Sequence, residues 1–582
     1  MIKTLWGQVK QYKKVSLLTP LFMVLEVLME VAIPLLMASI IDQGIEAGNM
    51  EKVCLYGGIM LVMAMLSLTF GVLGGKLAAK ASTGFACNLR ETMFERIQGF
   101  SFANIDKFST AGLVTRLTTD VSNLQNAYQM ILRMCVRAPV TLVCALIMAF
   151  TIHAKLALIF VAAIAFLATV LAVIISRVSG FFTQVFAQYD ALNSSVQENV
   201  SAIRVVKAYV REKYENKKFT AAAERLCGLF VKAESILTLN HPSMMLAVYG
   251  CMLSLSWLGA HMIVGGSLTT GQLTSLFSYV MNILMSLMML SMVFVMVTMS
   301  AASARRITEV LKEESTLKNP QNPVMMLENG QIDFNHVSFA YRQGSGRDVL
   351  QDVDFHIRSG ETIGIIGGTG SAKSTLVSLI SRLYDVTKGS VWVGGKDVRA
   401  YDLETLRNQV AVVLQKNILF SGTILENLRW GNEQADEAEC RRVCQLACAE
   451  EFIAKMPEGY QTRIEQGGTN VSGGQKQRLC IARALLKKPK ILILDDSTSA
   501  VDTATDAQIR KALAEEIPQT TKLIIAQRIS SVQDCDRILV LEEGRIDGFD
   551  THEALLKNNR IYREVYESQV SGGDFDKAGG AQ

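Results

Sequence analysis

The chain has 582 residues, of which 50% are hydrophobic and 19% charged, and its mean hydropathy is +0.26. Soluble proteins carry about 25% charged residues, so these values exclude a purely soluble enzyme, a disordered chain and a collagen-like chain. The formal net charge of +4 is small for this length and predicts no nucleic-acid partner. Apolar residues are concentrated before about residue 310, so we expect a membrane half followed by a soluble half.

Six apolar stretches in the first half are predicted to cross a bilayer as helices. They lie at about residues 15–41, 53–75, 138–152, 156–176, 242–265 and 273–300. A bilayer core needs about 20 apolar residues in helical form. The third span must therefore draw on residues 130–137 as well.

The connections between these spans predict the orientation of the chain. The short connections together contain only Lys52 and Lys155, whereas the long ones, at about 77–137 and 177–241, are rich in Lys and Arg. Basic connections face the cytosol, so we expect the long connections and both termini to be cytosolic. Residues 1–14 have two interpretations, a helix on the inner membrane surface or a plain basic flank.

The long connections keep the apolar spacing of helices, so the helices are predicted to continue well beyond the membrane. Aromatic residues lie near the two turns of these extensions, in residues 102–108 and 209–214. We expect both segments to contact the soluble half.

Two carboxylates interrupt the first span. Glu26 and Glu30 are four residues apart and share one helix face. Charged residues at membrane depth mark functional sites, so one hypothesis is that they line a transport path and favour cationic or zwitterionic solutes. The alternative is that protonated acids form hydrogen bonds between helices.

The last span is rich in methionine, and several of its methionines form a helical stripe that includes Met285, Met288 and Met292. Thioether side chains adapt to varied apolar shapes, so the stripe is a candidate for a promiscuous pocket. The alternative is a core or lipid-facing surface.

The cysteines and histidines predict no metal site. Eleven cysteines are scattered without a disulfide framework, and six histidines show no ligand spacing. Cys440, Cys444 and Cys448 repeat every four residues, which favours a buried helix stripe over a thiol metal site. We expect a reduced, cytosolic soluble half.

The soluble half contains a phosphate-binding motif. A strand at 362–366 precedes a glycine-rich loop and an apolar helix, which is the context that such a loop requires. We expect backbone N–H groups to bind phosphates, Lys373 to meet the β- and γ-phosphates, and Ser374 to bind Mg²⁺. The loop residues are Gly367, Gly368, Thr369, Gly370, Ser371, Ala372, Lys373, Ser374 and Thr375.

One position of this loop departs from the motif, because Ala372 replaces its final glycine. If that residue has a positive φ, its Cβ costs about 1 kcal/mol. The substitution would slacken the loop without abolishing nucleotide binding.

Two further motifs indicate a protein family. A buried-strand run at 491–494 ends in Asp495, a candidate Mg²⁺ ligand, and Val471-Ser-Gly-Gly-Gln475 lies between the two phosphate-site motifs. With these motifs in this order after six spans, the chain resembles an ABC transporter of the exporter type. The resemblance implies an α-helical six-span membrane domain plus an α/β P-loop nucleotide-binding domain, with ATP and Mg²⁺ as cofactors. The corresponding segments are a membrane domain at 1–310, a linker at 311–327, a nucleotide-binding domain at 328–570 and a flexible tail at 571–582.

The resemblance also implies roles for individual residues. Tyr341 resembles the aromatic that stacks on adenine, Gln415 the residue that links Mg²⁺ and water to the membrane helices, and Asp502 the D-loop acid. In this family two nucleotide-binding domains close head to tail, so each ATP lies between one domain's Walker motifs and the other's signature sequence. The signature residues are Ser472, Gly473, Gly474 and Gln475.

Two positions depart from the family pattern. The general base that follows Asp495 is normally Glu and is Asp496 here, and the switch histidine is replaced by Gln527. Gln cannot supply a titrating imidazole, and loss of positioned acid–base help costs about 10²–10⁴-fold in rate. We expect a site that binds ATP and hydrolyses it slowly; the alternative is a tolerated substitution in a working site.

The signature is intact apart from Val471 in place of the usual Leu. Such a signature beside a weak site implies a second, different subunit that supplies the catalytic Glu and His. The pattern resembles one half of bacterial heterodimeric multidrug exporters, which implies a location in the bacterial inner membrane, contact with lipid and small amphipathic substrates. Alternatives are a regulatory nucleotide-binding subunit without transport of its own, and a lipid or peptide exporter.

Overall fold

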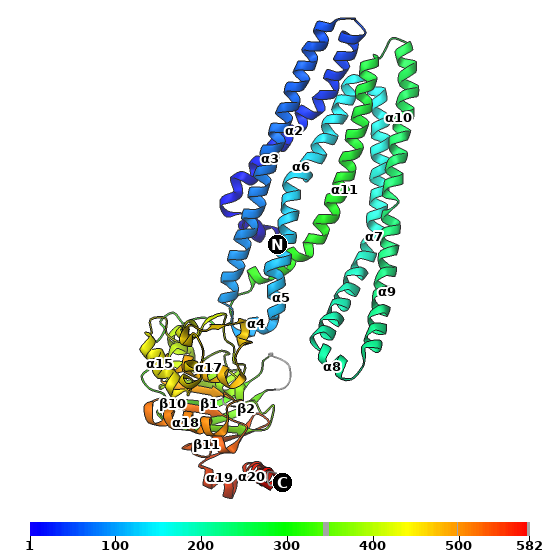
Figure 1. The fold of residues 1–582 in the computed structure, drawn as a ribbon. Helices are drawn as coiled ribbons and strands as arrows, with labels where there is room; N and C mark the ends of the chain where they lie inside the picture. Colours follow the sequence, from blue (N-terminus) through cyan, green and yellow to red (C-terminus); the bar gives the residue numbers. More distant parts are fainter. Residues whose placement is uncertain (342–347, 498, 579–582) are drawn as a thin grey trace. The chain divides into compact units, whose positions relative to one another are not determined.

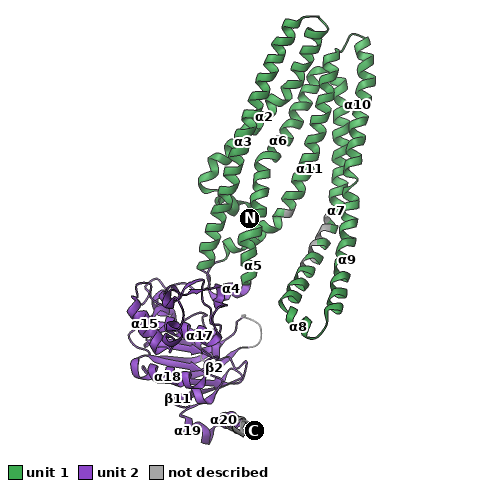
Figure 2. Cartoon of the chain, viewed as in Figure 1, with its two compact units in different colours: residues 1–98, 109–313 green, residues 99–108, 314–582 purple. Residues whose placement is uncertain are grey.

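The computed structural model describes residues 1–341, 348–497 and 499–578, with side chains left out at 179, 182, 183, 186, 187, 190, 299 and 570–578. The chain divides into two compact units (Figure 2). Unit 1 contains residues 1–98 and 109–313, and unit 2 contains residues 99–108 and 314–582. A short segment that interrupts the first half of the chain therefore belongs to the second unit.

Unit 1 is helical throughout its regular structure (Figure 1). Its elements are α1 (Ile2–Gly7), η1 (Lys10–Tyr12), α2 (Lys13–Ser39), η2 (Ile40–Ile45), α3 (Met50–Gln98), α5 (Thr110–Thr115), η3 (Arg116–Asp120), α6 (Val121–Ile152), α7 (Ala154–Ser201), α8 (Ile203–Ala208), α9 (Glu212–Leu237), α10 (Asn240–Val264) and α11 (Thr270–Lys312).

Six helical segments in the described part of the chain are long and apolar enough to cross a membrane. They are Lys10–Ile45, Met50–Gln98, Thr110–Ile152, Ala154–Val178, Glu212–Val264 and Thr270–Lys312. The prediction of six spans is confirmed, and the third span does include residues 130–137, because α6 begins at Val121.

The helices extend beyond the thickness of a membrane, as predicted. The 49 residues of α3 form a rod of about 74 Å, whereas a bilayer core is about 30 Å thick. The N-terminal segment packs on this rod: Tyr12 lies against Gly84, where an added Cβ would be 2.3 Å from the tyrosine ring. Asn88 of α3 also donates to the carbonyl oxygen of Gln8 at 2.9 Å. Residues 1–14 are thus largely helical and in contact with α3.

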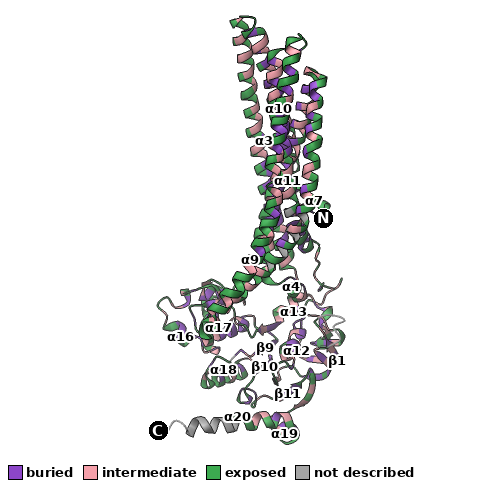
Figure 3. Ribbon diagram, turned by 90° about the vertical axis from the view of Figure 1, so that its right-hand side faces the viewer, coloured by how far each residue is buried: buried purple, intermediate pink, exposed green. Residues whose placement is uncertain are grey.

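One cluster of buried residues in unit 1 lies where α2, α6, α7, α10 and α11 face one another, and α3 contributes further buried residues between Gly74 and Met93. Exposed and half-buried residues cover the outer surfaces (Figure 3). Tyr279 of α11 is fully buried and donates its hydroxyl proton to the carbonyl oxygen of Val31 at 2.8 Å. Ser275 donates to the carbonyl oxygen of Pro34 at 2.6 Å. Polar groups inside this bundle therefore bond across helices, as a membrane interior requires.

Unit 2 combines helices with sheets. Its helices are α4 (Phe102–Phe108), α12 (Lys373–Ile380), α13 (Leu403–Gln409), α14 (Ile424–Arg429), α15 (Glu437–Leu446), α16 (Glu450–Ala454), α17 (Gly473–Leu485), α18 (Thr503–Glu516), α19 (His552–Asn558) and α20 (Arg560–Ala578), with η4 (Val398–Ala400), η5 (Gly459–Gln461), η6 (Gln466–Gly468) and η7 (Ile529–Ser531). Its strands are β1 (Ile332–Phe339), β2 (Leu350–Ile357), β3 (Thr362–Gly367), β4 (Lys388–Val393), β5 (Lys396–Asp397), β6 (Val410–Val413), β7 (Gly422–Thr423), β8 (Arg463–Ile464), β9 (Ile491–Asp495), β10 (Thr521–Ile525), β11 (Arg537–Glu542) and β12 (Arg545–Asp550).

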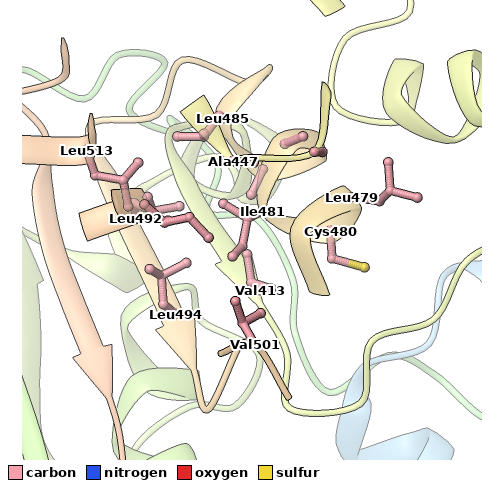
Figure 4. Close-up of a cluster of buried hydrophobic side chains, with 14 of the residues drawn as sticks. Val413, Ala447, Leu479, Cys480, Ile481, Leu485, Leu492, Leu494, Val501 and Leu513 are labelled. Atoms are coloured by element: carbon pink, nitrogen blue, oxygen red, sulfur yellow. The ribbon is translucent and has the colours of Figure 1, made fainter. Parts of the chain in front are cut away.

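The central sheet has the strand order β12-β11-β3-β10-β9-β6, and its strands are parallel except for β12. An antiparallel sheet has the order β2-β1-β4-β5, and β7 pairs with β8. All residues of β9 and β10 are buried, which is typical of parallel strands covered on both faces. On one face, Ile481 and Leu485 of α17 lie beside Leu492 and Leu494 of β9 (Figure 4).

This topology places the functional loops. Because β3, β10 and β9 are parallel neighbours, the loops that follow them emerge at one edge of the sheet, where α/β proteins bind ligands. These loops begin after Gly367, Ile525 and Asp495. The predicted fold class, a six-span helical domain followed by an α/β nucleotide-binding domain, is confirmed.

The predicted segment boundaries stay predictions, and two observed elements lie near them. Helix α11 continues to Lys312, and the contacts divide the units after residue 313 rather than 310. Helix α20 runs to Ala578, inside the range 571–582 that the sequence assigned to a tail. Residues 579–582 lie outside the described part of the chain.

Candidate nucleotide site

The loop between β3 and α12 surrounds the Lys373 amine. Its Nζ donates to the carbonyl oxygens of Gly367 and Gly368, both at 2.8 Å, and to Ser371 Oγ at 3.3 Å. An added Cβ on Gly367 would lie 2.2 Å from the carbonyl oxygen of Leu541, so no side chain fits there. Burial lowers the pKa of Lys373, while the nearby carboxylates Asp495 and Asp496 raise it. The amine, the loop and the amino end of α12 make a cradle suited to phosphate.

Ala372 has the backbone conformation that the sequence analysis considered. Its φ is 72° and its ψ is 22°, in the left-handed region. The glycine that the motif normally carries would adopt this conformation without a Cβ clash. The loop therefore contains a strained residue directly before Lys373.

Replacing Ala372 by Gly is expected to raise the free energy of unfolding of the soluble half by about 1 kcal/mol, because it removes this strain. Thermal unfolding of the full-length chain measures the effect. The matched variant Ala372→Val is expected to be less stable than wild type, because a β-branched residue tolerates positive φ poorly. A glycine variant less stable than wild type would contradict the prediction.

The candidate magnesium ligands lie together. Asp495 is the buried last residue of β9, and its side chain is hydrogen-bonded to Ser374. Burial raises the pKa of Asp495, as does the neighbouring Asp496, whereas Ser374 and Lys373 lower it. A hydroxyl and a carboxylate beside a phosphate cradle are oxygen donors of the kind that Mg²⁺ prefers. The residues present fit this ion, and it would neutralise charge on bound phosphates.

The carboxylate of Asp496, at the base position, contacts the side chains of Gln527, at the switch position, and of Gln415. Asp496, with a φ of 48°, accepts a hydrogen bond at Oδ2 from Gln527 Nε2 at 3.0 Å. Its side chain is also hydrogen-bonded to Gln415. Burial raises the pKa of Asp496, and the bonds to Gln415 and Gln527 lower it. The structure thus brings together the three residues that the sequence analysis named as catalytic candidates.

Tyr341 lies beside the phosphate loop. Its hydroxyl is 2.9 Å from Thr375 Oγ1, and its ring packs edge-to-face on Phe339 and Tyr384 with centroids 5.0 and 5.2 Å apart. The side chain is half exposed. An exposed aromatic face next to the amino end of α12 suits an adenine base.

The same aromatic cluster binds α4. Tyr384 donates its hydroxyl proton to Asp106 Oδ2 at 2.7 Å, and its ring contacts Phe102 at 6.0 Å. Burial raises the pKa of Tyr384, and Asp106 raises it further. The predicted contact of residues 102–108 with the soluble half is confirmed. The other segment, 209–214, lies in unit 1 with Tyr209 and Tyr214 exposed, and its contact stays a prediction.

The signature residues form the amino end of α17. Ser472 caps this helix, accepting a hydrogen bond from the Gln475 N–H, and the Gln475 side chain accepts one from the Ser472 N–H. An added Cβ on Gly474 would lie 2.8 Å from the carbonyl oxygen of Ala500, so the D-loop packs directly on the signature. Asp502 caps α18, and hydrogen bonds to Thr505 lower the pKa of Asp502.

The two intramembrane carboxylates have a partner that the sequence analysis missed. Arg137 of α6 donates from Nη1 to Glu26 Oε1 at 2.7 Å and from Nη2 to Glu30 Oε2 at 2.8 Å. Gly71 of α3 makes room for the group, since an added Cβ there would lie 3.0 Å from Glu26 Oε1. Arg137 falls within the residues added to the third span, and a charge at that depth was the signal available in the sequence.

The methionines of the candidate pocket lie on one exposed face of α11. Met285, Met288 and Met292 are 52%, 38% and 64% exposed, whereas the adjacent residues Leu284 and Leu287 are buried. The stripe is therefore not part of the core of this chain.

The cysteine stripe is a packing feature. Cys440 and Cys444 of α15 are fully buried, and burial raises the pKa of Cys444 to about 12. Among the residues that the structure describes, no group of three or more His, Cys, Asp or Glu side chains has a geometry that could hold a metal ion.

Comparison with known proteins identifies the family. Residues 17–288 match the model of the ABC transporter transmembrane region, and residues 350–499 match the ABC transporter model. The ABC transporter ATP-binding protein YfiB of Bacillus subtilis is 37% identical over 560 residues, which cover 96% of this chain and 97% of that protein. The chain belongs to the ABC transporter family. It is a half-transporter, with one membrane region fused to one ATP-binding domain.

Other ABC transporters agree with this assignment. A Mycobacterium tuberculosis ABC transporter ATP-binding protein is 34% identical over 574 residues, which cover 98% of both chains. The structure of a bacterial Atm1-family ABC exporter with ATP bound has a TM-score of 0.82 and 23% identity, covering 96% of this chain and 98% of that one. It shares the fold. This half-transporter is therefore a multi-pass membrane protein of the class of ATPase-coupled transporters.

Proposed function

We propose that this chain is one subunit of a heterodimeric ATP-driven exporter and that its own Walker-side site hydrolyses ATP slowly. The observation that carries the proposal is the pair formed by Asp496 and Gln527, in which a shortened carboxylate at the base position is bonded to an amide at the switch position. An amide donates and accepts but does not take up a proton at neutral pH. Neither residue replaces the Glu and His of an active site.

The signature side of the chain supports a different partner. Ser472, Gly474 and Asp502 keep a capped, closely packed arrangement, which suits completion of a competent site on the partner's Walker side. ATP closes the two soluble domains, and hydrolysis at the partner's Walker side resets them. Both termini and the nucleotide-binding domain face the cytosol of a bacterial cell, and the membrane domain spans its inner membrane.

The membrane half favours small amphipathic substrates. The exposed methionine face of α11 offers adaptable apolar contacts. Two carboxylates and one guanidinium leave the Glu26–Glu30–Arg137 group with one formal negative charge, which favours a cationic or zwitterionic solute. A regulatory subunit without transport of its own is the competing function, because its nucleotide site would have the same residues.

Transport by the purified pair in vesicles tests the proposal. We expect ATP-dependent uptake of cationic dyes into inverted vesicles, and loss of it when the partner's catalytic Glu is changed to Gln. The panel includes neutral dyes, and the variant Glu26→Gln/Glu30→Gln is expected to lose cationic dyes selectively. Absence of transport with any dye or lipid would favour the regulatory function, and equal losses of both dye classes would exclude charge selection.

A further inference from the structure

Helix α20 packs on the same hydrophobic core as the loop after β10 that contains the switch residue Gln527, called the switch loop below. Tyr562 is fully buried, and its hydroxyl lies 2.7 Å from His552 Nδ1. Val565 and Tyr566 pack against the same hydrophobic cluster, which includes Ile529 of η7. Positions 562, 565, 566 and 569 follow the helical spacing of three and four residues, so they share one face. This face is directed toward the segment that follows β10.

Gln569, at the end of that face, forms hydrogen bonds through both the nitrogen and the oxygen of its side-chain amide. Its Nε2 donates to the carbonyl oxygen of Gln527 at 2.8 Å, and its Oε1 accepts from the Ile529 N–H at 2.8 Å. These two backbone groups flank Arg528, between the last residue of β10 and η7. One side chain therefore fixes the main chain on both sides of Arg528, directly after the switch residue Gln527.

The fixed backbone determines where the Gln527 side chain lies. Its Nε2 reaches Asp496 Oδ2 at 3.0 Å while Gln569 holds its carbonyl oxygen. A continuous series of hydrogen bonds thus joins the carboxyl-terminal helix to the carboxylate at the base position. Breaking the Gln569 contacts would release the loop without removing any group that touches the nucleotide.

We infer that Gln569 is a positioning residue: it holds the switch loop so that Gln527 meets the γ-phosphate of bound ATP. The inference rests on the proposed assignment of Gln527 to the switch position, where its side-chain amide can form a hydrogen bond with the γ-phosphate. It does not depend on the heterodimer or on the rate of hydrolysis. ADP lacks the γ-phosphate. Loss of the Gln569 hydrogen bonds therefore weakens the binding of ATP and leaves the binding of ADP unchanged.

The test compares nucleotide affinities of the full-length chain in lipid nanodiscs. Displacement of a fluorescent nucleotide gives the Kd of Mg²⁺ complexes of a non-hydrolysable ATP analogue and of ADP. We expect Gln569→Ala to bind the ATP analogue about fivefold more weakly than wild type, as loss of such hydrogen bonds would produce, with ADP affinity unchanged. Gln569→Glu keeps the acceptor for Ile529 and loses the donor to Gln527, and it is expected to resemble Gln569→Ala.

The matched control is Glu564→Gln on the same helix, where Glu564 forms an exposed pair with Arg560; it is expected to leave both affinities unchanged. Equal weakening of both nucleotides would indicate a general structural role and overturn the inference, as would unchanged affinities in both Gln569 variants. Rapid ATP hydrolysis by the isolated wild-type chain would overturn the proposed slow site and leave this inference standing, so the two failures are distinguishable.

Discussion

The double variant Asp496→Glu/Gln527→His is expected to hydrolyse ATP about a hundredfold faster than the wild-type chain. Glu restores the methylene by which Asp496 falls short of the position of an attacking water. His restores a side chain that can carry a proton at the switch position. The rest of the site, including Lys373 and Asp495, is already arranged around the phosphate loop. Phosphate release from the purified full-length chain in nanodiscs measures the gain.

Two controls accompany this variant. Each single substitution is expected to give a smaller gain than the pair, because Asp496 and Gln527 are in direct contact and act together. Lys373→Ala in the double-variant background should remove the gained activity. A double variant that hydrolyses ATP at the wild-type rate would show that residues other than these two limit hydrolysis.

The substitution Arg137→Gln is expected to lower the free energy of unfolding by about 3–5 kcal/mol. Arg137 is the observed partner of both Glu26 and Glu30, and its removal leaves two carboxylates in an apolar bundle. Glu26 is the more buried of the two, with a side chain that is 12% exposed. Chemical unfolding in detergent micelles measures the loss.

The triple variant Glu26→Gln/Glu30→Gln/Arg137→Gln provides the matched control. Because it removes the unpaired charges together with the guanidinium, it is expected to recover most of the lost stability. If Arg137→Gln unfolds like wild type, the three charges contribute no net stability in the bundle. If the triple variant is as unstable as Arg137→Gln, the loss comes from packing rather than from charge.

The nucleotide site could be predicted from sequence because its groups lie close together in the chain or in motifs of fixed spacing. Lys373 and Ser374 follow β3, Asp495 ends β9, and only β10 separates these two strands in one parallel sheet. The backbone strain at Ala372 could also be anticipated, because it depends only on whether the φ angle of this residue is positive. The six spans followed from apolar length alone.

The contacts that the sequence did not predict join distant segments through single polar atoms. Arg137 lies 107 residues from Glu30, and no periodic pattern marks such a pair. Gln569 lies 42 residues beyond Gln527 on a helix that carries no nucleotide motif. Tyr384 and Asp106 are 278 residues apart. The sequence therefore predicted that α4 contacts the soluble half, but it did not predict that Tyr384 is the partner. Side-chain hydrogen bonds between remote elements depend on the finished fold.

The place of residues 99–108 in unit 2 has a consequence for how the chain is made. The partners of α4 are Thr316, whose N–H donates to Asn104 Oδ1, and Tyr384, and both are synthesised after every described helix of unit 1. A ribosome adding about 5–20 residues per second needs about 14–56 s to pass from Asp106 to Tyr384. During that interval residues 99–108 lack one or both of these partners, and the Phe102 ring lacks its contact with Tyr384. Residues 99–108 therefore reach their folded contacts only after Tyr384 has been synthesised, and a ribosome stalled before that point would leave Phe102 and Asp106 without their partner.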